Sequence, residues 1–127
     1  LLEGLVWGHR SAHHIAASLE PRTAALFDDI PPWKPTGTQE PDPALVAQDV
    51  TSIKNIMWNY VGLVRTTPRL ARAIRELRNL EVEIERFYRA AALSDDLIGL
   101  RNSIRVALIV TLAAWENPES RGCHYRE

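Results

Sequence analysis

The sequence predicts an all-α protein, an up-down-up three-helix bundle preceded by a separate helix and a Pro-rich linker. Apolar residues recur at three- and four-residue spacings over four separate stretches, which is the period of one helix face. Six of the eight prolines fall within residues 20–43, where they exclude a long helix and a central strand. No stretch of the sequence has the alternation that predicts a strand.

Composition narrows the class of protein further. The 127 residues are enough for one compact domain, and 15 basic against 16 acidic side chains argue against general nucleic-acid binding. The single cysteine, Cys123, excludes an internal disulfide and is compatible with the cytoplasmic location that we expect. We expect no membrane span, because no apolar run approaches about 20 residues, and the first residues do not form a signal peptide.

The first helix is predicted over about residues 2–19, and the linker follows over residues 20–43. The linker has room for a short turn of helix at residues 24–27. The apolar pattern of the first helix begins without an initiator Met or a capping residue, and the last residues, 120–127, bring no closing signal. We therefore expect this chain to be a piece of a longer protein.

Residues 44–117 carry the three helices of the predicted bundle. The first is expected over about 44–64, the second from a cap at Thr67-Pro68 to about Ala91, and the third from the Ser94 cap to just before Pro118. Helices joined by such short connections pack antiparallel. Residues 118–127 are predicted to form an extended carboxyl-terminal segment.

Within the bundle, Leu77 and Ile104 stand in the middle of the apolar stripes of their helices. Both are therefore predicted to be core residues.

Several polar patterns in the sequence could form sites. His9 and His13 share a helix face at a spacing that could hold zinc, but the pattern fixes no further ligand, so no metal site is predicted. Cys123 and His124 are neighbours whose side chains point in different directions, which disfavours a nucleophile and base pair. The acidic pairs at 28–29 and 95–96 are interpreted as a solvated turn and a helix start.

The largest basic feature is a run of arginines on and before the third predicted helix. Its members are Arg65, Arg69, Arg72, Arg75, Arg78, Arg86 and Arg89. A binding strip is one interpretation, and a solvated face with Arg72–Glu76 and Glu85–Arg89 pairs is the favoured one. Arg121 is expected to anchor the closing segment through its five donors.

Gly4 and Gly8 weaken the first helix by up to about 1 kcal/mol each relative to alanine. Close approach of another backbone or of a flat ligand would compensate this loss. Tolerance of glycine near a frayed helix end is the other interpretation.

Four segments carry a resemblance to a known family. Residues 1–10, 57–66, 100–102 and 119–125 resemble, in order and spacing, the carboxyl-terminal part of the L-aspartate oxidases. The Ser-Arg-Gly-x-His motif at 120–124 is also similar to the flavoprotein subunits of succinate dehydrogenase and fumarate reductase, the wider superfamily. The stretch at 57–66 favours the oxidases over the respiratory subunits.

The resemblance implies an FAD enzyme that oxidises L-aspartate to iminoaspartate in NAD biosynthesis, with oxygen or fumarate as electron acceptor. Quinolinate synthase would take its product and is a possible partner. Residues 1–19 would belong to the FAD-binding domain, and Leu1, with Leu2 beside it, would lie against the flavin. The residues that grip the substrate would precede this chain, so we predict no catalytic residue here and a structural role for the fragment.

Two alternatives stay open. The chain could be a free-standing helical interaction module, or the carboxyl-terminal domain of a succinate dehydrogenase or fumarate reductase flavoprotein.

Overall fold

A computed structural model describes residues 2–18, 30–32 and 37–127. The chain divides into two compact units, Leu1–Trp33 and Lys34–Glu127. The first unit holds helix α1 (Leu2–Ser18). The second holds, in order, α2 (Pro43–Tyr60), β1 (Val64–Arg65), α3 (Thr67–Ala90), α4 (Asp95–Glu116) and β2 (Tyr125–Arg126).

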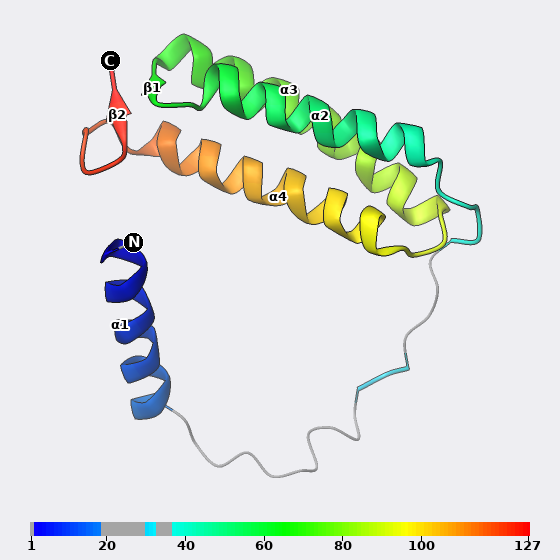
Figure 1. Cartoon of the computed structure of the whole chain (residues 1–127), viewed down its shortest axis with the longest axis horizontal. Helices are drawn as coiled ribbons and strands as arrows, with labels where there is room; N and C mark the ends of the chain where they lie inside the picture. Colours follow the sequence, from blue (N-terminus) through cyan, green and yellow to red (C-terminus); the bar gives the residue numbers. More distant parts are fainter. Residues whose placement is uncertain (1, 19–29, 33–36) are drawn as a thin grey trace. The chain divides into compact units, whose positions relative to one another are not determined.

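Helices α2, α3 and α4 lie side by side as a three-helix bundle, which confirms the predicted all-α architecture (Figure 1). Each of these helices begins after a capping residue whose side-chain oxygen accepts a hydrogen bond from a backbone N–H in the first turn. The capping residues are Asp42 for α2, Thr66 for α3 and Ser94 for α4. The cap of α3 therefore lies one residue before the predicted Thr67, and Pro68 occupies the first turn, where its missing amide hydrogen costs nothing.

The core lies along the middle of the bundle, between α3 and α4, and α2 packs alongside both helices. Leu77 and Ile104 are both 0% exposed, as predicted from their positions on the apolar stripes. The largest fully buried side chains are Leu70, Leu77, Ile84, Leu97, Leu100, Ile104 and Thr111. The one polar member, Thr111, donates its hydroxyl to the Ala107 carbonyl at 2.7 Å, so it leaves no unpaired group in the core.

The prediction that α2 runs to residue 64 is wrong, because the helix ends at Tyr60. The Val61 amide still donates to the Met57 carbonyl, and the chain then leaves the helix. A Cβ on Gly62 would lie 2.6 Å from the Trp58 carbonyl oxygen, so this tight exit requires glycine.

The prediction of no strand is also wrong. Val64–Arg65 pairs in parallel with Tyr125–Arg126, in the register Val64 to Tyr125 and Arg65 to Arg126. Because α2 and α4 run in the same direction, the segments that follow them meet at the same end of the bundle (Figure 1). Strands of two residues are too short to show an alternating pattern in the sequence.

At the opposite end, residues 37–42, which fall within the predicted linker, are tied to the bundle. Gln39 donates its amide to the Ala90 carbonyl at 3.2 Å and accepts from the Ala92 amide at 2.7 Å. A Cβ on Gly37 would lie 2.3 Å from the Ala90 carbonyl carbon, so glycine is required for this approach. The predicted helical turn at residues 24–27 lies outside the described residues.

Helix α4 is long and apolar enough to cross a membrane by length and composition, although Arg101 and Arg105 interrupt its apolar residues. Its seven buried residues are part of the bundle core. On its polar side, Arg101 and Arg105 pair with a carboxylate of α3. These contacts are those of a core helix, and one such helix is weak evidence for a membrane span.

The four-residue spacing predicted a pair between Glu85 and Arg89. Glu85 instead links α3 to α4. Its carboxylate accepts from Arg101 Nε at 2.7 Å and from Arg105 at 2.8 Å. Arg101 also lies 4.2 Å over the Tyr88 ring. The bond from Arg101 is the main cause that lowers the pKa of Glu85, with smaller contributions from its charge and from Arg105, against an opposing effect of burial.

Because the pKa of Glu85 is lowered on folding, its stabilising effect is present at neutral pH and is lost as pH falls through that lowered value. Glu85→Gln should therefore lower the free energy of unfolding by about 1 kcal/mol at pH 7 and by nothing at strongly acidic pH. Urea unfolding across pH measures this difference. Glu76→Gln, in the exposed pair with Arg72, is the control and should cost distinctly less, because water screens that pair. An unchanged loss at acidic pH would contradict the assignment.

Truncating the core should have the largest effect on folding. Leu77→Ala and Ile104→Ala should each lower the free energy of unfolding by about 2–5 kcal/mol, since both side chains are fully buried. Val82→Ala is the matched control, because this valine lies on α3 and is 51% exposed. Deleting residues 1–19 should cost less than either core change. Urea unfolding of the four variants checks this, and a larger loss on deletion would show that the first helix belongs to the core.

Candidate functional site

The residues expected to face a flavin stand at the start of α1. Leu1 lies outside the described residues, and Leu2 is 79% exposed in the first helical turn. A Cβ on Gly4 or Gly8 would meet nothing within 4 Å, so nothing within α1 requires glycine at either position. The large apolar residues that α1 exposes are Leu2, Leu5, Val6, Trp7 and Ile15.

His9 and His13 lie on one face of α1, with ring centroids 4.5 Å apart. Among the residues that the structure describes, no group of three or more His, Cys, Asp or Glu side chains could hold a metal ion. The acidic pair at 28–29 lies outside the described residues, and Asp95 and Asp96 occupy the first turn of α4, as predicted.

The predicted arginine run divides into two parts. On α3 the arginines are exposed, and Arg72 pairs with Glu76 at 2.6 Å, as the solvated-face interpretation predicted. Arg65 is different, because it is half-buried and its Nε donates to the carbonyl oxygens of Val61 and Gly62. It closes the end of α2 rather than belonging to an outer face.

Arg65 also begins a cluster that we call the carboxyl-terminal clasp, which consists of Arg65, Asn117, His124 and Arg126. Arg65 donates to His124 Nδ1 at 2.7 Å, and His124 Nε2 lies 2.9 Å from the Asn117 carbonyl oxygen. A guanidinium can only donate and a carbonyl can only accept, so in this arrangement Nδ1 accepts from Arg65 and Nε2 donates to the Asn117 carbonyl. Both ring nitrogens are thus occupied, and none is left to act as a base for the neighbouring exposed Cys123.

The expectation that Arg121 anchors the closing segment is wrong. Its side chain is exposed, and among the residues that the structure describes it pairs with Glu119 alone, two residues away in the same segment. Arg126 holds the end of α4 instead, donating to the Trp115 carbonyl at 2.9 Å and to the Thr67 hydroxyl at 2.8 Å. Between the two arginines the chain turns at Gly122, whose φ of 56° favours glycine, and Arg121 pairs with His124 across this turn.

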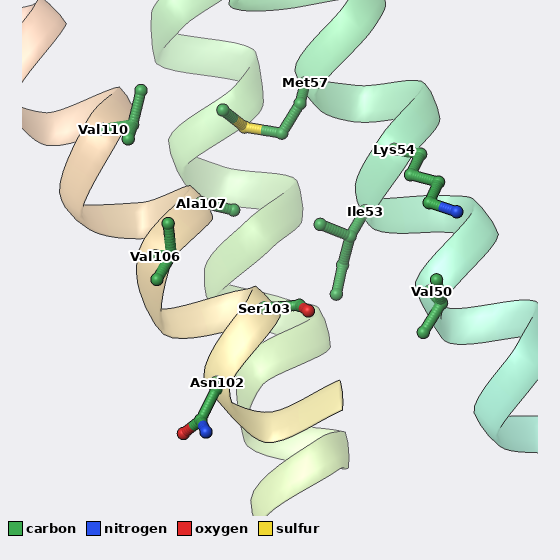
Figure 2. A pocket seen from close by; sticks show the side chains of 9 residues that line it. All are labelled: Val50, Ile53, Lys54, Met57, Asn102, Ser103, Val106, Ala107 and Val110. Atoms are coloured by element: carbon green, nitrogen blue, oxygen red, sulfur yellow. The ribbon is translucent and has the colours of Figure 1, made fainter. Parts of the chain in front are cut away.

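A groove runs between α2 and α4, with a volume of about 420 Å³ (Figure 2). We call it the α2/α4 groove. Its lining is Val50, Ile53, Lys54, Met57, Asn102, Ser103, Val106, Ala107 and Val110. Figure 2 shows the side chains of α2 facing those of α4 across the opening.

A second hollow of about 650 Å³ adjoins the groove and shares Lys54, Met57 and Val110 with it. Trp58 lines this hollow and is 82% exposed. Lys54 is the single charged residue among those that line the groove itself. The arrangement is therefore apolar and suited to binding rather than to acid-base chemistry.

The carboxyl groups with shifted pKa values lie outside the groove lining. Burial, and after it the charge of Glu83, raises the pKa of Asp49, while the bond from Arg101 lowers that of Glu85. Both are explained by packing between helices.

Comparison with known proteins gives a consistent result. Residues 50–127 match the family described as fumarate reductase flavoprotein C-term. The chain is 40% identical to an L-aspartate oxidase of Yersinia pestis over 98% of its length, and 40% identical to one of Halobacterium salinarum over 99%. These matches cover 23% and 24% of the relatives, so the chain spans about a quarter of their length.

The clasp gives a direct test of which arginine anchors the closing segment. Arg126→Lys loses the fork that reaches α4 and Thr67, so it should cost about 1 kcal/mol. For a domain of this size, that loss lowers the melting temperature by about 4–8 °C. Arg121→Lys is the control and should leave the melting temperature unchanged. Equal melting temperatures for both variants, or a larger loss from the Arg121 change, would contradict the assignment.

Proposed function

The chain belongs to the fumarate reductase flavoprotein C-terminal family, and we propose that it is the carboxyl-terminal helical domain of an L-aspartate oxidase. The observation that carries the proposal is identity of 40% to L-aspartate oxidases of two distant organisms over nearly the whole chain. The four segments that resemble the oxidases include the last turn of α2 and two residues of the carboxyl-terminal clasp, Arg65 and His124.

On this proposal the full-length protein is a cytoplasmic FAD enzyme that oxidises L-aspartate to iminoaspartate, with oxygen or fumarate as the acceptor and quinolinate synthase as the consumer of the product. The flavin supplies the two-electron oxidant when bound. Relatives four times as long as this chain leave ample length for a flavin-binding body and for the groups that grip the dicarboxylate.

This chain would contribute structure rather than chemistry. Its described residues hold no metal-ligand cluster, and its groove is apolar. Leu1 and Leu2 are the residues that we assign to the flavin, with α1 belonging to the FAD-binding domain. The exposure of Leu2 and the open space at Gly4 and Gly8 support this assignment, because a flat ring needs an uncrowded apolar face.

The activity test uses the purified full-length protein with L-aspartate and oxygen. We expect hydrogen peroxide to form in proportion to the aspartate consumed, and no reaction with succinate as the matched control substrate. Oxidation of succinate instead would assign the chain to a succinate dehydrogenase or fumarate reductase flavoprotein. Absence of both reactions in a protein that carries no flavin would favour the free-standing interaction module.

The 127-residue chain alone should fold without retaining FAD or oxidising aspartate, because its sequence has no glycine-rich phosphate-binding loop while the bundle has its own complete core. Gel filtration after incubation with excess FAD, followed by a flavin absorbance spectrum, measures retention. Stoichiometric flavin in the protein peak would contradict a purely structural role.

A further inference from the structure

We propose that the α2/α4 groove, together with Trp58, is the surface by which the bundle docks on the flavin-binding body of the full-length polypeptide. This inference rests on the proposed function and adds to it the face that makes the contact. The basis is a difference between two outer faces of the bundle, one of them charged and the other apolar.

The outer face of α3 is built for water. Six of its exposed positions carry arginines and one carries Glu83, and Arg72 pairs with the half-buried Glu76. Val82 is the one large apolar residue that this helix exposes. Covering such a face would strip water from many charges, which costs free energy unless each finds a partner. The solvent-facing side of the domain is therefore the α3 side.

The face formed by α2 and α4 is the opposite in character. Trp58 is 82% exposed and Val106 is 59% exposed, and the two hollows beside them share Met57 and Val110 as a continuous floor. A contiguous apolar surface around an exposed tryptophan is the usual centre of an interface, where aromatic anchors supply most of the binding free energy. Within the second unit, the described residues leave these side chains uncovered.

The length of the relatives and the charge of the groove lining indicate what covers the groove. The relatives are about four times as long as this chain, so a covalently attached body is present beside every copy of the groove at high effective concentration. The family match begins at Val50 and so includes both walls of the groove. Lys54 is the one charge in the groove lining, and Arg65 lines the hollow beside Trp58. The partner surface is therefore apolar and carries at most two acidic groups, one opposite each cation.

Hydroxyl-radical labelling of Trp58, read by mass spectrometry, tests this proposal in the full-length protein and in the 127-residue chain. Docking should slow labelling of Trp58 by about tenfold in the full-length protein. Equal labelling in the two proteins would overturn the proposal. Protection that grows with the concentration of the 127-residue chain would also overturn it, because a second copy would then fill the groove.

Paired variants of the full-length protein locate the contact. Val106→Asp places a charge in the groove and should return Trp58 labelling to the rate of the 127-residue chain. Val82→Asp is the matched control, a similarly exposed valine on α3, and should leave Trp58 protected. Equal effects of the two variants would overturn the assignment of the face, and circular dichroism of each variant verifies that the helices are intact.

The same preparations separate this inference from the proposed function. Aspartate oxidation with an accessible Trp58 would defeat the docking surface alone. A protected Trp58 in a protein that oxidises succinate but not aspartate would defeat the function and leave the docking surface standing.

Discussion

The apolar layer between α3 and α4 is the interaction on which the bundle depends. Leu77 and Ile84 of α3 meet Leu100 and Ile104 of α4 in one cluster, and all four are buried. Helix α2 adds Val46 and Ile53 to the same cluster. Because this layer is complete without α1, the bundle needs no contact beyond its own unit to bury its core.

Both ends of the bundle are closed by short backbone links rather than by more core. At one end the bridge of Gln39 to Ala91 joins the segment before α2 to the connection between α3 and α4. At the other, the β1–β2 pair and the carboxyl-terminal clasp satisfy carbonyl groups that helices α2 and α4 leave without intrahelical partners.

The helices could be predicted from the sequence because each has a local signal, a capping residue followed by a 3.6-residue apolar period. The clasp could not, since Arg121 and Arg126 look alike in sequence. What separates them is the turn at Gly122 and a contact with Thr67, 59 residues away. The pairing of Glu85 with Arg101 instead of Arg89 could not be predicted either, because Arg101 lies on another helix. The groove depends on which apolar residues the packing leaves uncovered, and periodicity alone does not reveal that.

Native-state hydrogen exchange of the 127-residue chain tests the primacy of the α3–α4 layer most directly. The account predicts that amides in the central turns around Leu77 and Ile104 exchange only through global unfolding, with an exchange free energy equal to that from urea unfolding. Amides of α1, which buries none of its residues, should exchange much faster. Equal protection of α1 and the centre of α3, or exchange of the α3 and α4 centres by local opening, would contradict it.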